Sequence, residues 1–171
     1  MNLKTFSQQS RTVLMEGVAK KLLYWGFNEK GEVLEEPKKV PGGYIWRGDE
    51  PFDDPNVPVL WTALKSGIAS KGIEVVVEEA AYTWFNRMMG MQIMAKNGYD
   101  ETQLDYVEGM QHTPMLLQRA RQGNYSFLEP KEQERLQKII SDYNKDQEAF
   151  ALLLTGYCHS HNTLNRVFGK L

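Results

Sequence analysis

The chain has 171 residues, enough for one domain with its own core, and 42% hydrophobic and 25% charged residues are ordinary for a globular protein. A net charge of −2 excludes a global positive field that would draw the protein to nucleic acid or to an acidic membrane, although a local basic face is compatible with it. Cys158 is the only cysteine, so no internal disulfide can form, which suits a reducing, cytoplasmic setting.

The sequence contains no signal for membrane insertion or export. The first residues, MNLKTFSQQSRTVL, lack the apolar run of a signal peptide. No window approaches the roughly 18 consecutive apolar residues that a membrane span needs. We therefore expect a cytoplasmic protein with no membrane partner.

Residues 3–25 are predicted to form an amphipathic helix, because their apolar residues recur at helical spacing. Arg11, Lys20 and Lys21 make this segment basic, with Glu16 as the opposing acid. Such residues usually form a solvated helix face, but Lys and Arg are also the residues that contact DNA phosphates. A strip that binds DNA or a partner therefore remains an open alternative.

Residues 27–58 form an irregular insertion. Five of the seven prolines lie here, together with several glycines, so no long helix fits. The short runs GEVL (31–34) and GYIWRG (43–48) are predicted to pair as a small β-hairpin.

The remainder of the chain reads as helical. Short helices are predicted at 59–70 and 113–122, a long one at 73–97 that stops at Gly98, and two more at 130–154 and 155–168. The predicted fold is mainly α: a single helical domain over residues 1–171 with a long central helix.

The helix at 73–97 is apolar almost all round, which predicts that it is buried at the centre of the domain. Trp84 and Phe85 then read as core residues. Asn86 and Arg87 lie on its narrow polar stripe, and a buried guanidinium is costly unless it is paired. These two residues either organise the core or belong to a surface that meets something outside the chain.

Cys158, His159 and His161 do not form a predicted metal or nucleophile site. Adjacent positions on a helix do not face one point, and structural zinc sites use a different ligand spacing. We therefore predict no catalytic residue and no metal ligand. A Cys–His nucleophile pair depends on a spatial contact that sequence does not show, so a small enzyme with its own His/Cys site stays as a further alternative.

The block GIEVVVEEAAYTWFNRMMGMQIMAKNGY, residues 72–99, resembles the N-terminal region of the adenine-specific DNA methyltransferases of bacteriophage-exclusion (BREX) systems, the PglX family. Related large restriction–modification methylases carry similar stretches. The opening residues Leu3 to Phe6, and Leu152-Leu153-Leu154 followed by Cys158-His159, are similar to the family in order.

The resemblance implies a parent protein that methylates adenine N6 in phage defence with S-adenosylmethionine as cofactor. It implies as partners the protein's own catalytic domain, DNA through the parent protein, and other subunits of a defence complex. Within the chain it marks a set of structural or interface residues: Tyr82, Trp84, Phe85, Asn86 and Arg87. The residues expected to contact DNA or a partner rest on the basic character of the first helix instead, and they are Arg11, Lys20 and Lys21.

The catalytic motifs of that reaction are absent from the sequence. The chemistry needs a glycine-rich cofactor loop on a doubly wound sheet and an Asn/Asp-Pro-Pro-Tyr/Phe motif for the flipped adenine. The chain has no Pro-Pro dipeptide and no alternation of strands and helices. We therefore expect a non-catalytic N-terminal domain that braces a catalytic domain, with no cofactor of its own. The alternative is a free-standing helical module that binds nucleic acid or protein.

Overall fold

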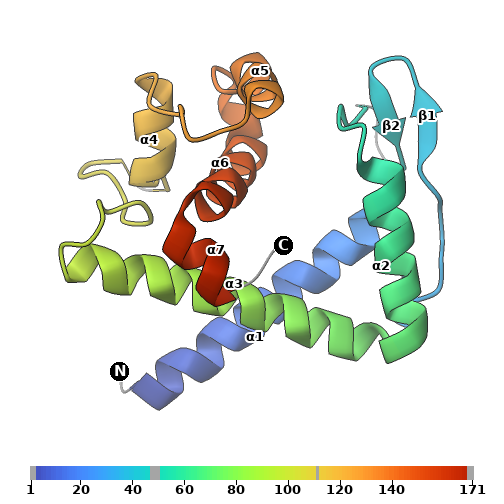
Figure 1. Cartoon of the computed structure of the whole chain (residues 1–171). Coiled ribbons are helices and arrows are strands. Elements are labelled where there is room, and N and C mark those ends of the chain that lie inside the picture. Colours follow the sequence, from blue (N-terminus) through green and yellow to red (C-terminus); the bar gives the residue numbers. More distant parts are fainter. Residues whose placement is uncertain (1–2, 47–50, 111, 169–171) are drawn as a thin grey trace. The chain divides into compact units, whose positions relative to one another are not determined.

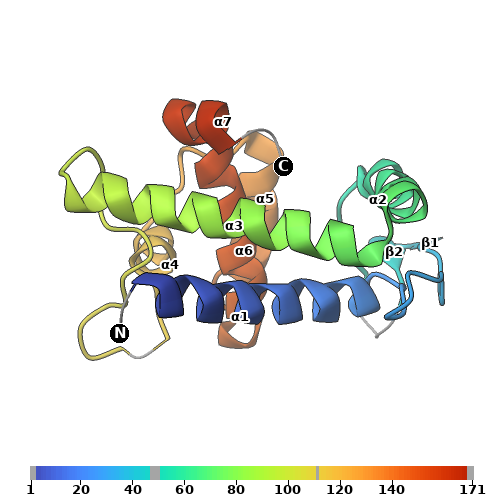
Figure 2. The same ribbon diagram turned by 90° about the horizontal axis from the view of Figure 1, so that it is seen from below.

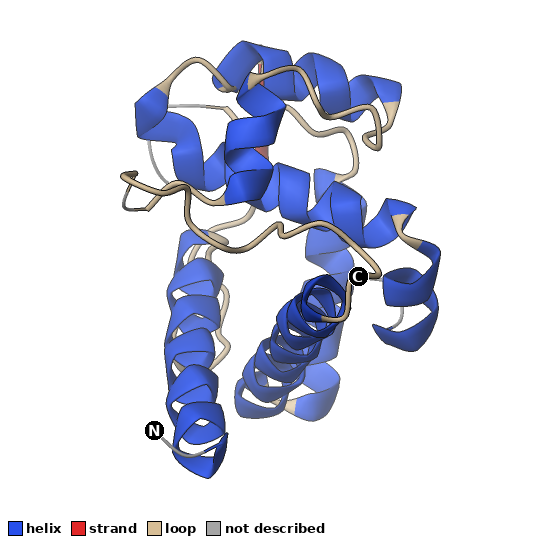
Figure 3. Ribbon diagram, turned by 90° about the vertical axis from the view of Figure 1, so that its left-hand side faces the viewer, coloured by secondary structure: helices blue, strands red, loops and turns tan. Residues whose placement is uncertain are grey.

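The computed structural model describes residues 3–46, 51–110 and 112–168, and it confirms a mainly α fold (Figures 1 and 3). Only the backbone is described for residues 3–4 and 167–168. The elements in chain order are α1 (Leu3–Tyr24), β1 (Lys38–Val40), β2 (Gly43–Ile45), α2 (Val57–Lys71), α3 (Ile73–Lys96), α4 (Met115–Arg121), α5 (Pro130–Ile139), the 3-10 helix η1 (Tyr143–Lys145), α6 (Asp146–Ser160) and α7 (Asn162–Phe168).

The chain forms two compact units, Met1–Phe85 (unit 1) and Asn86–Leu171 (unit 2). The boundary falls within α3, so both units contain part of that helix. A single domain over residues 1–171 stays a prediction.

Unit 1 is built around aromatic side chains. Phe27, 1% exposed, stacks on Trp61 with 5.3 Å between ring centroids. The ring of Trp25 meets Trp46 edge-on at 4.7 Å, and its carbonyl accepts a 2.8 Å hydrogen bond from Trp61 Nε1. The chain turns sharply after α1 at Gly26, which has φ +91° and lies so close to the Glu35 carbonyl that a Cβ would be 2.1 Å from its oxygen. These contacts join α1, the insertion and α2 in one core.

The insertion does contain a hairpin, but its predicted pairing was wrong. β2 pairs with β1, residues 38–40, in the antiparallel register Lys38–Ile45 and Val40–Gly43. Val33 of the GEVL run instead forms an isolated bridge with Phe27. Pro41 and Gly42 occupy the turn, and a proline followed by a residue with positive φ, here +91°, is typical of a tight turn that fixes the register. Arg47 and Gly48 of the other predicted run lie outside the described residues.

Unit 2 is arranged around α6. Helices α4, α5 and α7 and the 3-10 helix all contact it (Figure 1). The buried side chains are mainly aliphatic: Leu116, Leu117, Leu136, Leu153 and Leu164. α5 and α6 are separate helices that contact each other, which a single helix over 130–154 could not do.

The predicted helices 130–154 and 155–168 were therefore wrong at their boundaries. α5 ends at Ile139, and the Asp142 side chain accepts a 2.9 Å hydrogen bond from the Asn144 backbone N–H, which caps the new turn. α6 then continues to Ser160, past the predicted break. α2 begins at Val57 because Pro58 is well placed in a first helical turn.

All-round burial of the long helix was also wrong. Val77, Ala81 and Met91 are buried, but Tyr82 is 65% exposed and Ile93 is 56% exposed. One side of α3 has packing partners and the other faces solvent. Apolar residues on both sides of a helix do not by themselves make it buried. Burial also requires that other elements of the fold cover both sides.

Candidate functional site

The five motif residues of α3, which run from Tyr82 to Arg87 without Thr83, differ in their exposure to solvent. Tyr82 is exposed, Trp84, Phe85 and Asn86 are half-buried, and Arg87 is 1% exposed. Tyr82, Trp84 and Phe85 close unit 1, whereas Asn86 and Arg87 open unit 2. The motif is therefore not one continuous surface patch.

Arg87 is a buried cation in unit 2 beside the Cys158 thiol, which is also 1% exposed. Burial lowers the pKa of Arg87, and the negative form of Cys158 opposes that shift. Burial raises the pKa of Cys158, and the Arg87 charge works against this shift. The thiol is thus held in its neutral form, which is the unreactive state of cysteine. Burial and the raised pKa of Cys158 both disfavour a nucleophilic role for its thiol.

The three basic residues predicted on α1 do not form one strip. Arg11 forms an ion pair with Glu78 of α3. Lys20 lies nine positions further on, about two and a half helical turns, and so on the opposite side of α1. Lys21 lies over the Tyr24 ring, 4.7 Å from its centroid. Lys20 and Lys21 are both exposed.

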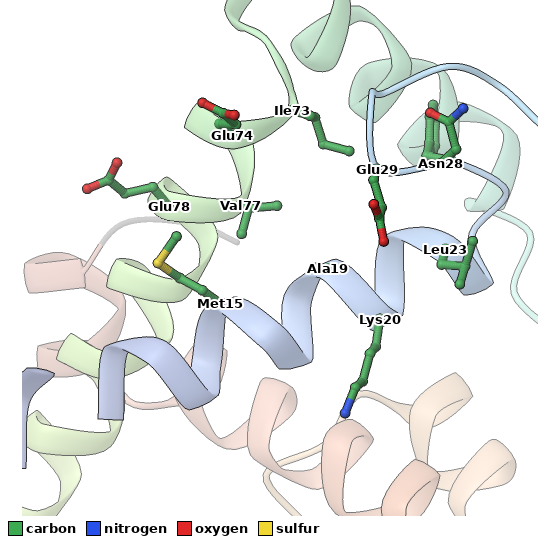
Figure 4. Close-up of a pocket in the computed structure, with 11 residues that line it drawn as sticks. Met15, Ala19, Lys20, Leu23, Asn28, Glu29, Ile73, Glu74, Val77 and Glu78 are labelled. Carbon is green, nitrogen blue, oxygen red and sulfur yellow. The ribbon is translucent and has the colours of Figure 1, made fainter. Parts of the chain in front are cut away.

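A groove of about 530 Å³ lies between α1 and the first turns of α3, within unit 1 (Figure 4). Figure 2 shows the ribbon of α1 running alongside these turns of α3. We call it the α1–α3 groove. Met15, Ala19 and Leu23 follow one another at four-residue spacing on the α1 wall, and Ile73 and Val77 do so on the α3 wall. The small Ala19 between two larger side chains leaves the hollow open. Its charged rim consists of Glu29, Glu74 and Glu78, whereas the Lys20 side chain starts from the α1 wall and is directed away from α3 (Figure 4).

The loop after α1 closes one end of this groove. The Asn28 side-chain oxygen accepts 2.9 Å hydrogen bonds from the backbone N–H groups of Lys30 and Glu32, which holds the turn. Gly31 packs on α2 and α3, where a Cβ would lie 3.3 Å from Ile73 Cβ. Glu29 is therefore held at the rim by an ordered loop.

A polar network fastens the segment after α3 to unit 2. The Tyr157 hydroxyl donates a hydrogen bond to the Asp100 carboxylate, and burial together with this bond raises the pKa of Tyr157. Nearby, Arg119 donates to Gln103 at 3.1 Å and pairs with Glu101 at 3.0 Å. Every group here has a structural partner, so we assign the network to stability.

The described residues lack two arrangements that metal and cofactor sites use. They contain no group of three or more His, Cys, Asp or Glu side chains that could hold a metal ion. Within the same ranges the strands are the two of the hairpin, and neither leads through a glycine-rich loop into a helix as an S-adenosylmethionine site requires. Among these helices none is both long and apolar enough to cross a membrane.

The chain is similar to the adenine-specific methyltransferase BrxX of Escherichia coli O9:H4 (strain HS). The two are 26% identical over 98% of this chain, and the chain spans 14% of the length of that relative. No family model matches the chain. The similarity supports a relationship to adenine-specific methylases and concerns a small part of such a protein.

Sequence reasoning missed the α1–α3 groove. The four-residue spacing of Met15, Ala19 and Leu23 was a usable signal, but it does not show that α3 lies opposite. The predicted burial of the helix at 73–97 left no room for a groove wall, whereas Ile73 is only half-buried.

Proposed function

We propose that the chain is a non-catalytic helical domain, at the N-terminal end of an adenine-specific DNA methyltransferase of a phage-defence system, that braces the catalytic domain. The observation that carries the proposal is the similarity to BrxX, which covers 98% of the chain but only 14% of the relative. The family-like block over residues 72–99 supports it independently. S-adenosylmethionine, the flipped adenine and the methyl transfer belong to the parent protein in this proposal.

The fold supports a bracing role. The described ranges are mainly helical, with no parallel sheet to hold the cofactor. α3 leaves large apolar side chains exposed, including Tyr82 at 65% and Ile93 at 56%. Apolar surface of this kind is what contacts between domains bury. Arg87, buried in the same helix, would keep the helix in place while its exposed side meets the catalytic domain.

A methyl-transfer assay tests the non-catalytic part. The chain is incubated with DNA and S-adenosylmethionine that carries a tritiated methyl group, beside an established adenine methyltransferase on the same DNA. We expect no tritium in the DNA from the chain and ready incorporation by the control enzyme. Incorporation by the chain above a protein-free blank would contradict the proposal.

Contact with DNA or with a partner subunit is a second candidate function, favoured by the exposed Lys20 and Lys21. Anisotropy of a labelled DNA duplex measures it at low salt. Lys20→Gln with Lys21→Gln should weaken binding and reduce the slope of log affinity against log salt by about 1.8, since each phosphate contact contributes about 0.9. Lys131→Gln, an exposed lysine of unit 2, is the matched control. Arg11→Gln does not isolate DNA binding, because it also removes the ion pair with Glu78.

A further inference from the structure

We propose that the α1–α3 groove is a docking site for an amphipathic helix of a separate partner protein, one that carries apolar anchors and basic residues along one flank. This binding activity goes beyond the proposed bracing of a catalytic domain and does not depend on it. The shape of the groove, its exposed apolar surface, the charges on its rim and the order of its loop all support the proposal.

The shape fits a helix. The α1 wall extends from Met15 to Leu23, eight residues or about 12 Å at 1.5 Å per residue. Apolar side chains four residues apart line both walls, and Figure 4 shows Met15, Ile73 and Val77 directed into the space between the helices. A helix placed along such a groove inserts side chains at i, i+4 and i+7. The volume of about 530 Å³ accommodates a few such anchors.

The apolar surface of the groove is available for contact. Leu23 is 45% exposed, and Ala19 is also exposed. Phe27 and Val77, at 1% and 8%, form a buried base beneath them. When an apolar side chain of a partner covers this exposed wall, apolar surface leaves water, and this makes the free energy of binding more favourable.

The rim selects a basic segment. Glu74 and Glu78 follow one another at four-residue spacing beside the apolar α3 wall, and Glu29 stands at the loop end. Glu78 is neutralised by Arg11, whereas Glu29 and Glu74 have no ion-pair partner among the described residues. The Lys20 side chain starts from the α1 side and is directed away from α3 (Figure 4). The fitting helix therefore carries Lys or Arg on the flank that faces α3 and the loop.

The loop end of the groove is ordered, because the Asn28 hydrogen bonds hold the turn that carries Glu29. An ordered wall spends less binding free energy on ordering itself. The ion pair of Arg11 and Glu78 links α1 to α3 but is exposed and contributes little rigidity.

The test uses two labelled helical peptides about 15 residues long, near the length at which an isolated helix becomes stable. Both carry leucines at i, i+4 and i+7. One has lysines along one flank, and the other has glutamates at the same positions. Fluorescence anisotropy with the 171-residue chain should show the lysine peptide binding at least about tenfold more tightly.

Two variants assign that binding to the groove. Ala19→Phe fills the hollow from an exposed position and should abolish binding while circular dichroism stays unchanged. Glu29→Lys with Glu74→Lys should reverse the preference toward the glutamate peptide. Glu108→Lys with Glu134→Lys, an equal charge change at two exposed sites in unit 2, should leave the preference as it was.

Several outcomes would overturn the proposal. They are equal affinity for the two peptides, binding by neither peptide, or binding that Ala19→Phe leaves intact. Self-association that Ala19→Phe abolishes would assign the groove to a second copy of this chain. Binding of a small apolar dye, but of neither peptide, would assign it to a small molecule. Catalytic inactivity or a short source gene would leave the proposal unaffected.

Discussion

The two compact units are stabilised by different chemistry. Unit 1 is stabilised by contacts between aromatic side chains, those of Trp25 with Trp46 and of Phe27 with Trp61. Its ion pair Lys65–Glu36 is exposed, with 47% and 62% of the two side chains accessible to solvent. Unit 2 has an aliphatic core, and its arginines form half-buried pairs. Arg121–Asp146 has side chains 15% and 31% exposed, and Arg135–Glu148 has 18% and 39%.

This difference has thermodynamic consequences. The contribution of buried aromatic side chains to the free energy of unfolding depends little on pH or on screening by salt. The attraction within an ion pair is stronger where the pair is shielded from water, and salt weakens it. Exposed pairs contribute little to stability, about 0–1 kcal/mol. We therefore expect core truncations to dominate the stability of unit 1 and polar substitutions to matter more in unit 2.

The tryptophans allow the two units to be followed separately. All four, at positions 25, 46, 61 and 84, lie in unit 1. Intrinsic fluorescence therefore reports unit 1, while far-ultraviolet circular dichroism reports helices of both units. Coincident urea transitions would support the predicted single domain over residues 1–171, and separate transitions would contradict it.

Phe27→Ala should give the largest effect. The ring is 1% exposed and stacks on Trp61, so its removal leaves a cavity in the aromatic core. We expect a loss of about 3–5 kcal/mol in the free energy of unfolding, measured by urea denaturation with fluorescence detection. A loss below about 1 kcal/mol would mean that the aromatic cluster does not hold unit 1.

Tyr157→Phe should cost about 2–3 kcal/mol, the range for a buried hydrogen bond to a charged group. Burial and the bond to Asp100 raise the pKa of Tyr157 in the folded state. Its stabilising contribution is therefore complete below the unfolded-state pKa of about 10 and is lost as the pH rises above that value. Urea titrations at pH 8 to 11, followed by circular dichroism, should show a steeper alkaline loss for the native chain than for the variant. Identical alkaline slopes would refute this assignment.

Arg121→Gln should destabilise the protein by about 1–2 kcal/mol, since it removes a half-buried ion pair with Asp146 and a cation–π contact, 4.3 Å from the Tyr143 ring centroid. The effect should shrink in high salt. Lys65→Gln, which breaks the exposed pair of unit 1, is the control and should change stability by less than about 1 kcal/mol. Equal effects of the two variants would remove the proposed difference between the units.

Gly17→Ala should give the smallest effect, and it should be favourable. Gly17 lies inside α1, and a Cβ there would meet nothing within 4 Å. Alanine should therefore raise the free energy of unfolding by about 0.5–1 kcal/mol, because it loses less backbone freedom than glycine when the helix forms. Gly26→Ala is the contrasting variant. Its φ of +91° and the 2.1 Å approach to the Glu35 carbonyl oxygen should make it destabilising. Thermal melting of both variants measures the difference, and a shift of equal sign would contradict the account of unit 1.

The long helices were predictable from sequence because local signals define them. α1 and α3 end within one residue of their predicted limits, where apolar spacing stops and Gly98 follows the end of α3. The hairpin partner was not predictable from β-propensity, because Lys38 and Lys39 do not read as a strand. That pairing is decided by the turn at Pro41 and Gly42.

The sequence at the break between α5 and α6 contains a helix-capping signal, but the apolar residues around it follow a continuous helical pattern. Asp142 is a good capping residue, yet Ile139, Ile140 and Tyr143 continue a helical pattern across it. Burial was the hardest feature to predict. Tyr82 and Ile93 lie on an apolar side of α3 that no described element covers, and only tertiary structure decides that.

The sequence of the source gene beyond codon 171 tests the central claim most directly. The account predicts that the reading frame continues into a glycine-rich loop and an Asn/Asp-Pro-Pro-Tyr/Phe motif, the parts of an adenine methyltransferase that this chain lacks. A stop codon directly after Leu171 would contradict it, and the protein would then act alone as a helical binding module.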